Sequence, residues 1–204
     1  MTDPAVPRTL VIACGALVRE LRTVLATIPG TDAVRVEYLP AHLHTTPDAI
    51  PDAVARVAAA HRADRVVVAY ADCGTGGRLD ATVAALGAVR LPGPHCYELF
   101  AGTEGFAALM DEAPGTFFLT DFLARHFDAL VVGSLGLDRH PELRDVYFAH
   151  YERVVLLSQS GAPEVLDAAR RAATRLGLPL VSGPTGLGPF RATVAAAVAA
   201  PVPA

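Results

Sequence analysis

The sequence predicts an α/β fold: a three-layer sandwich with a mainly parallel central sheet, Rossmann-like and doubly wound. Short runs of β-branched and aliphatic residues alternate with alanine-rich segments of helical periodicity. The run Arg65–Tyr70 is nearly continuously apolar, as in a strand buried on both faces. The 204 residues suffice for one full core. We expect a single domain over residues 9–199, a disordered or extended N-terminus at 1–8 and a tail at 200–204.

The first half of the chain contains four expected strands. These lie at Thr9–Cys14, Val34–Leu39, Arg65–Tyr70 and Ala88–Leu91. Helices are expected between them because apolar residues recur at helical spacing, with Leu17, Leu21 and Val24 on one face of the first. Thr46 could cap the second helix, which Pro47 begins. These helices span Ala16–Ile28, Pro47–His61 and Leu79–Leu86.

The second half repeats the alternation. Strands are expected at Thr116–Leu119, Val154–Ser158 and Leu180–Ser182. Gly177 ends the best-defined helix, because glycine tolerates the left-handed conformation that closes a helix. The expected helices are Glu98–Asp111, Asp121–Ala129, Pro141–Tyr151, Pro163–Leu176 and a terminal one within Ala192–Val202. Alternation of this kind implies right-handed crossovers and a parallel sheet.

Composition and charge exclude several classes of function. Hydrophobic residues make up 52% and charged residues 19%, which is typical of a globular protein. The net charge of −4 makes a nucleic-acid or anionic membrane partner unexpected. No signal peptide and no spanning segment is recognisable, so we expect a cytoplasmic protein with free or metal-bound thiols. A homo-oligomer is compatible with these features.

Three cysteines share one topological position. Cys14 ends the first strand, Cys73 follows the third and Cys96 follows the fourth. Parallel strands end at a common edge of the sheet, where ligands bind at the reversal of strand order. We therefore expect Cys14, Cys73 and Cys96 to meet there. The alternative is that each cysteine is an ordinary small buried hydrophobe.

Three thiolates could hold a metal and leave one position open. A 4Fe–4S cluster with one free iron and a Zn²⁺ ion with His95 or His44 as a fourth ligand both suit this donor set. The cofactor is therefore a 4Fe–4S cluster or Zn²⁺, undecided between the two. A third option is metal-free: one nucleophilic cysteine with resolving partners.

Several neighbouring residues are candidates for substrate binding or proton transfer. His44, His95 and Glu98 lie near the expected edge and could move protons, although each could equally be an ordinary surface or helix-end residue. Glycine-rich loops between strand and helix present backbone N–H groups to anions. The expected substrate-binding residues are Gly15, Gly74, Thr75, Gly76, Gly77 and His140.

Six blocks of the chain together resemble a known family. They are Ala13–Leu17, Leu43–Pro47, Tyr70–Gly77, Gly93–Tyr97, Phe118–Phe122 and Leu137–Leu143. The set is similar to the bacterial and archaeal "domain of unknown function 1638" family, over about residues 9–190. Other branches of that family carry His-Asp-Cys in the fourth block, where this chain has Pro94, His95 and Cys96. Members are often encoded near corrinoid-dependent methyltransferases, so the resemblance implies one-carbon or methylated-amine metabolism.

The leading hypothesis is an enzyme of the transferase or lyase class. It uses a thiolate-bound metal at Cys14, Cys73 and Cys96 on a small anionic or thiol substrate. The alternative is a non-catalytic accessory protein that delivers a metal or corrinoid to a methyltransferase. A soluble α/β domain with three incidental thiols is the remaining reading.

Overall fold

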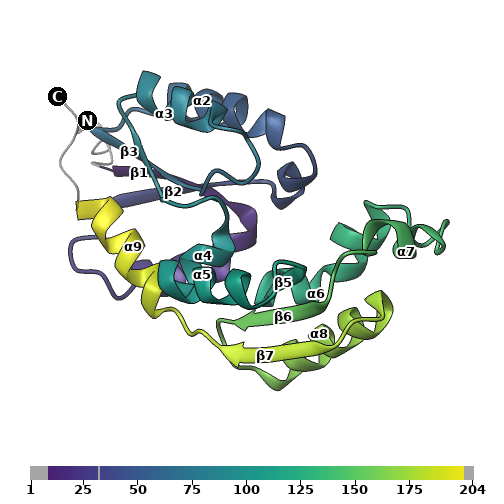
Figure 1. Cartoon of the computed structure of the whole chain (residues 1–204). Helices are drawn as coiled ribbons and strands as arrows, with labels where there is room; N and C mark the ends of the chain where they lie inside the picture. The colour runs from purple at the N-terminus through teal and green to yellow at the C-terminus, as the bar shows by residue number, and fades with distance from the viewer. Residues whose placement is uncertain (1–8, 32, 200–204) are drawn as a thin grey trace. The chain divides into compact units, whose positions relative to one another are not determined.

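The computed structural model describes residues 9–31 and 33–199. The N-terminal segment 1–8 and the tail 200–204, about which the sequence made predictions, lie outside the described residues. The chain divides into two compact units (Figure 1). The first comprises Met1–Leu99 with Pro189–Ala204, and the second comprises Phe100–Gly188. We describe each unit separately.

The first unit contains a four-stranded parallel sheet. Its strands are β1 (Thr9–Cys14), β2 (Val34–Leu39), β3 (Arg65–Ala69) and β4 (Val89–Arg90), in the order β2-β1-β3-β4. In register, Thr9 of β1 lies between Val34 of β2 and Arg65 of β3. The predicted bounds of β1 and β2 are confirmed. β3 ends one residue earlier than predicted, at Ala69, and β4 contains only the two middle residues of the predicted Ala88–Leu91.

The helices of the first unit lie on both faces of this sheet. The chain passes from β1 to β2 in one direction and from β2 to β3 and β4 in the other. Right-handed crossovers therefore place α1 on one face and α2 and α3 on the other. Figure 1 shows α2 and α3 together, with α9 on the opposite face. The helices are η1 (Gly15–Leu17), α1 (Val18–Leu25), η2 (Ala41–Thr45), η3 (Pro47–Ala49), α2 (Ile50–Ala60), α3 (Arg78–Ala85), α4 (Cys96–Ala101) and α9 (Gly188–Ala199).

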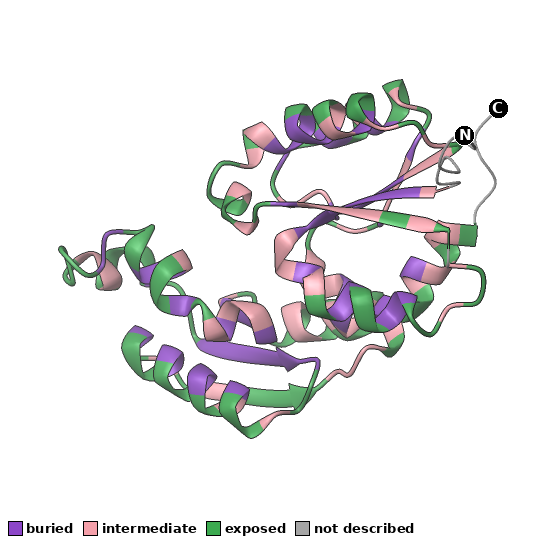
Figure 2. Cartoon of the chain, turned by 180° about the vertical axis from the view of Figure 1, so that it is seen from behind, coloured by how far each residue is buried: buried purple, intermediate pink, exposed green. Residues whose placement is uncertain are grey.

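The core of the first unit is formed by its central strands. After Thr9, every residue of β1 is buried, as Figure 2 shows for the strand. Arg65, at the start of β3, donates to the carbonyls of Ala197 and Val198 and so satisfies the carboxyl end of α9. Apolar burial on both faces of the sheet supplies most of the stability of the first unit. The Arg65 side chain holds the last turn of α9 against the start of β3.

The second unit contains a three-stranded parallel sheet in the order β5-β6-β7. Its strands are β5 (Thr116–Thr120), β6 (Arg153–Ser158) and β7 (Leu180–Pro184). Phe117 and Phe118 point to opposite faces of β5, as consecutive strand residues do. The Phe118 ring meets Phe106 at a centroid distance of 5.2 Å, and the Phe117 ring meets Phe148 at 5.6 Å.

The helices of the second unit depart from the prediction at three places. They are α5 (Thr103–Glu112), α6 (Asp121–Arg125), a π-helix (Asp128–Gly133), α7 (Leu143–Tyr147) and α8 (Pro163–Leu176). The predicted helix Glu98–Asp111 is two helices, because Gly102 has a φ of 76° between them. The predicted helix Asp121–Ala129 changes into a π-helix, and that over Pro141–Tyr151 is limited to α7. Only α8 has the predicted bounds.

A buried carboxylate fixes the carboxyl edge of the second sheet. Asp121 is 1% exposed. It accepts hydrogen bonds from Ser158 Oγ and the Gln159 and Ser160 amides, each at 3.0 Å. This carboxylate joins the loop after β6 to the start of α6.

The α/β class with parallel sheets is confirmed. In place of one continuous central sheet, the described residues contain a doubly wound sheet in the first unit and a separate sheet in the second. None of the described helices has the length and apolar character that a membrane crossing requires.

Candidate functional site

The candidate site lies where the strand order of the first sheet reverses. The chain leaves β1 toward β2 on one side, and β3 occupies the other side of β1. In parallel sheets with crossover connections on both faces, ligands bind beyond the strand ends at such a point. The residues that lie there are Cys14, at the end of β1, and the segment Tyr70–Cys73, which follows β3.

Cys14 is the buried thiol of the site. Its side chain is 3% exposed, and its sulfur accepts a hydrogen bond from the Ala16 amide at 3.3 Å, which caps η1. The two ring nitrogens of His44 lie 3.7 and 3.9 Å from the same sulfur. Burial raises the pKa of the Cys14 thiol to about 11, against the lowering influence of the Ala16 amide and Tyr70. Cys14 is therefore a neutral thiol at physiological pH.

His44 lies between two of the thiols. It comes from η2, after β2, and its Nδ1 lies 3.0 Å from the Ala41 carbonyl oxygen. Donation from Nδ1 to that carbonyl leaves Nε2 able to exchange a proton. Although His44 is exposed, desolvation of its ring would by itself lower its pKa, whereas hydrogen bonding to Cys73 and the charge of the Cys73 thiolate raise it overall. A protonated His44 beside Cys73 is thereby favoured.

Cys73 has an unusual backbone conformation. Within residues 9–31 and 33–199 it is the only non-glycine residue with a positive φ, at 52°. Its amide donates to the Pro94 carbonyl at 2.8 Å, and the Asp72 amide donates to the Gly93 carbonyl at 3.1 Å. These bonds tie the loop after β3 to the loop after β4. Left-handed non-glycine residues are costly and concentrate at functional sites.

Cys96 completes the group of thiols at the start of α4. Its pKa is raised well above the ordinary value, first by burial and then by the charges of Cys73 and Cys14, with a smaller contribution from Glu20. The three thiols are thus within electrostatic reach of one another, and none is in a disulfide. In the described part of the chain, no three His, Cys, Asp or Glu side chains are arranged around a point where one metal ion could sit.

The glycine-rich loop after β3 already binds a carboxylate of its own. Asp72 accepts hydrogen bonds from Thr75 Oγ1 at 2.6 Å, the Gly77 amide at 3.0 Å and the Gly76 amide at 3.2 Å. These bonds, led by that of Thr75, lower the pKa of Asp72 despite the opposing effect of burial. An external anion would have to displace Asp72 from Thr75, Gly76 and Gly77. Gly74 has a φ of 85° and contributes a turn beside Pro47.

Four predicted site residues remain to be placed: Gly15, His95, Glu98 and His140. At Gly15, a Cβ would lie 2.7 Å from the Leu39 carbonyl oxygen, so close backbone approach explains this glycine. His95 is exposed and faces the Tyr97 ring at 6.1 Å. The Glu98 carboxylate lies against Gly93, 2.8 Å from where a Cβ would be. His140 belongs to the second unit, where its Nδ1 lies 3.3 Å from a Glu142 carboxylate oxygen.

Sequence reasoning missed two residues of this site. Tyr70 is 1% exposed, its ring stacks on His44 at 6.4 Å, and burial followed by the charge of Cys14 raises its pKa. The Tyr70 hydroxyl interacts with the Cys14 thiol, which lowers the pKa of Cys14 and raises that of Tyr70, and it has no other hydrogen-bond partner among the described residues. Glu20 is 7% exposed on α1. Its spacing from Leu17 and Val24 could have revealed a carboxylate on the buried helix face.

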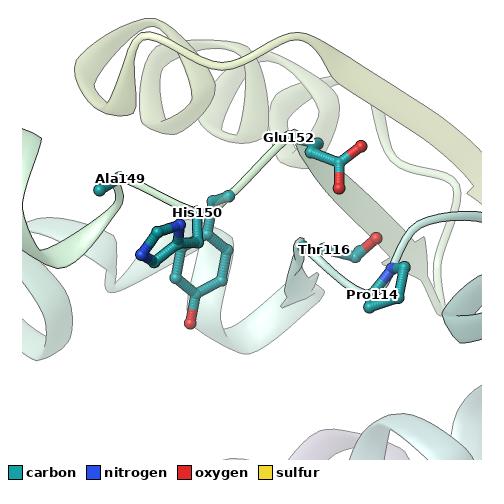
Figure 3. Close-up of a pocket in the computed structure, with 7 residues that line it drawn as sticks. Pro114, Thr116, Ala149, His150 and Glu152 are labelled. Atoms are coloured by element: carbon teal, nitrogen blue, oxygen red, sulfur yellow. The ribbon is translucent and has the colours of Figure 1, made fainter.

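A cavity of about 710 Å³ lies in the second unit (Figure 3). It is lined by Pro114, Gly115, Thr116, Ala149, His150, Tyr151 and Glu152. These residues precede or begin β5 and β6, so the cavity is at the amino ends of the strands. Parallel sheets bind ligands at the opposite, carboxyl edge.

Comparisons with known proteins give one family and one partly similar structure. No curated protein matches the chain. Ornithine carbamoyltransferase from Pyrococcus furiosus is similar at 11% identity and a TM-score of 0.24, over 88% of this chain and 55% of that enzyme. The chain therefore spans about half the length of that enzyme. The family model described as "Protein of unknown function (DUF1638)" matches residues 38–194, a range that includes His44, Tyr70, Cys73 and Cys96 but begins after Cys14. With more than half of its length matched, the chain belongs to the DUF1638 family.

Proposed function

We propose that the chain is an enzyme whose active site is the carboxyl edge of the first sheet, between β1 and β3. Cys14, Cys73 and Cys96 hold a metal centre there that keeps one position open for a small anionic or thiol substrate. The observation that carries this proposal is the grouping of three free thiols, His44 and Tyr70 at one topological switch point.

The ionisation of the thiols supports a cationic centre. Without a metal, burial raises the pKa of Cys14 to about 11 and that of Cys96 well above its ordinary value. Two such neutral thiols make poor nucleophiles. A bound metal supplies the positive charge that stabilises thiolates in a buried place. A cation bound there would offset the burial that raises these pKa values.

Of the two metal centres, the one that we propose is the iron–sulfur cluster. Tetrahedral zinc needs its donors about 2.3 Å from one point. The described side chains contain no such convergent group. A 4Fe–4S cluster places its cysteine ligands at separate corners, so they need not converge. An open iron would supply Lewis-acid chemistry to a bound substrate.

The remaining residues of the site position the ligands and move protons. The Ala41 carbonyl fixes the His44 ring, and Nε2 then exchanges a proton with a substrate beside Cys14 and Cys73. The bonds from Cys73 to Pro94 and from Asp72 to Gly93 hold two of the thiol-bearing loops together. The one-carbon setting implied by the family resemblance fits a thiol substrate, because thiolate-bound metals activate thiols for alkyl transfer.

A metal-free thiol enzyme is the second candidate, favoured by the geometry of Cys73 alone. Its left-handed backbone at a strand end and its pairing with His44 suit a nucleophile. Cys14 and Cys96 would then be resolving thiols. This candidate differs from the first in predicting full activity in protein that contains no metal.

Elemental analysis and UV–visible spectra of aerobic and anaerobic preparations test the proposal. We expect brown anaerobic protein with equal amounts of iron and sulfide, and loss of most of the iron in each of Cys14→Ser, Cys73→Ser and Cys96→Ser. His42→Ala is the matched control for His44→Ala, because both histidines are exposed on the same short helix and, of the two, His44 is the one beside the Cys14 sulfur. Metal content no higher than in the triple Cys→Ser variant would refute the metal proposal. Rapid alkylation at Cys73 in that protein would then support the thiol enzyme.

A further inference from the structure

The exposed large apolar side chains of the second unit are concentrated in one segment. Within residues 9–31 and 33–199, four of the five such side chains lie between positions 135 and 151, namely Leu135, Val146, Tyr147 and Tyr151. Single exposed apolar residues are ordinary on a protein surface, whereas a group of them marks an interaction surface. This segment is therefore the first place to look for a partner of the second unit.

The most exposed members of the group lie on α7, a helix that begins on the core. Leu143, its first residue, packs against the core of the second unit. Val146 and Tyr147, about one turn later, are 68% and 46% exposed. Figure 1 shows α7 at the end of the second unit, away from β5, β6 and β7. The helix is thus fixed at one end and presents apolar side chains to solvent at the other, so it loses little freedom on binding.

The cavity of about 710 Å³ follows this helix directly. Its lining comprises residues 149–152, just after α7, and residues 114–116 at the start of β5 (Figure 3). The Tyr151 ring in the lining contacts the ring of Phe148 at 5.2 Å and that of Phe117 at 5.8 Å. An aromatic surface is therefore already in place, and aromatic side chains are enriched in the centres of protein interfaces.

The charges around α7 are of both signs. Between positions 138 and 145, the carboxylates of Asp138, Glu142 and Asp145 alternate with the guanidinium groups of Arg139 and Arg144. Two of the resulting ion pairs join sequence neighbours, Arg139 with Asp138 at 3.9 Å and Arg144 with Asp145 at 2.6 Å. Such solvent-exposed pairs are weak and can exchange partners. A second copy of the same segment complements this mixture, whereas a strongly acidic or basic partner would match only one sign.

We propose that two copies of the chain associate through the second unit, with the exposed end of α7 of each copy inserted into the cavity of the other. In a two-fold interface, a residue that contacts a second residue of the partner is also matched by the reverse contact. A protruding helix and a cavity in the same unit therefore form two equal contacts. This inference does not depend on the proposed function, which concerns the first unit.

Sedimentation velocity of the full-length chain over a concentration series tests the proposal. We expect wild type to be a dimer at about 100 μM. Val146→Asp should raise the dimer Kd by about thirtyfold or more, because every dimer contains the changed contact twice. Val181→Asp is the matched control, since Val181 is 44% exposed on β7 and lies outside the segment. It should leave the Kd unchanged.

A change in the cavity provides the complementary test. Pro114 is exposed and lies across the cavity from Ala149 (Figure 3), so Pro114→Arg should fill the cavity and weaken the dimer as Val146→Asp does. Pro179→Arg is its control, because Pro179 is an exposed proline just before β7. A mixture of Val146→Asp and Pro114→Arg should associate more strongly than either variant alone, because one intact helix then meets one intact cavity.

Four results would overturn the inference. A wild type that is monomeric at about 100 μM would assign the surface to a different partner, and a mass that grows beyond a dimer would exclude a closed two-fold contact. Equal association of Val146→Asp and Val181→Asp would exclude α7. A mixture no more associated than its two components would exclude insertion of α7 into the cavity. Circular dichroism checks the fold of each variant, and Tyr147→Ser replaces Val146→Asp if that variant does not fold.

Discussion

Replacing Asp72 with alanine removes the acceptor around which the loop after β3 is built. Three groups donate to its carboxylate: Thr75 Oγ1 at 2.6 Å, the Gly77 amide at 3.0 Å and the Gly76 amide at 3.2 Å. Thr75 is 1% exposed, whereas both glycines are exposed. The loop also carries Cys73, so its order decides where that thiol lies.

The free-energy cost of Asp72→Ala follows from these exposures. The buried Thr75 hydroxyl loses its acceptor, which costs about 1–2 kcal/mol. The exposed amides of Gly76 and Gly77 can turn to water, so each costs about 0.5 kcal/mol. We expect Asp72→Ala to lower the free energy of unfolding by about 2–3 kcal/mol. Asp72→Asn keeps one oxygen and should cost about half as much.

Urea unfolding of metal-free protein measures this cost. Asp64→Ala is the control, because Asp64 is an exposed aspartate just before β3 and its replacement should change stability by less than about 0.5 kcal/mol. If Asp72→Ala unfolds at the same urea concentration as Asp64→Ala, the carboxylate does not hold the loop.

The pH dependence gives a second, independent check. The Thr75 hydrogen bond, opposed by burial and aided by the Gly77 and Gly76 amides and Arg90, lowers the pKa of Asp72 in the folded protein. A lowered folded-state pKa means that the stabilisation is present above the unfolded value of about 3.9 and is lost as pH falls through the folded value. The difference between wild type and Asp72→Ala should therefore be constant near pH 7 and shrink below about pH 4. A difference that persists in acid would contradict the role of the charge.

Three further predictions concern other parts of the chain. Gly15→Ala should destabilise the protein by about 1–3 kcal/mol, because the new methyl group would lie 2.7 Å from the Leu39 carbonyl; urea unfolding measures it, with Ala16→Gly as a comparison. Iodoacetamide at pH 8, followed by peptide mass spectrometry, should label Cys73 before Cys14 and Cys96, whose pKa values are raised by burial; faster labelling of Cys14 would contradict its burial. Asp121→Ala should cost about 3–5 kcal/mol because it leaves buried donors unpaired, and near-neutral behaviour in thermal unfolding would rule out its role as a clamp.

The fold was predictable where apolar runs are long. The bounds of β1 follow from a continuous apolar run, those of β2 from alternating apolar residues, and those of α8 from helical periodicity. Local patterns do not encode which strands pair, so the division into two sheets could not be anticipated. The break at Gly102 was missed because the residues on both sides of it favour helix.

The location of the site could be predicted from the sequence, but the contacts between its residues could not. The common edge of Cys14 and Cys73 follows from the strand alternation. The glycine loop pointed to an anion, but the nearest carboxylate is its own Asp72. Tyr70 extends an apolar strand, so its hydroxyl gave no signal until its surroundings were known.

The distribution of unfavourable features distinguishes the site from the rest of the first unit. Near Cys14 lie a left-handed Cys73 and thiols whose ionisation burial opposes. Each of these features costs stability in the free protein. The next turn of the loop after β3 is, by contrast, held by three hydrogen bonds to Asp72. A rigid, satisfied support beside a strained and unsatisfied centre is what a binding site requires, because the ligand then supplies the missing charge and hydrogen bonds.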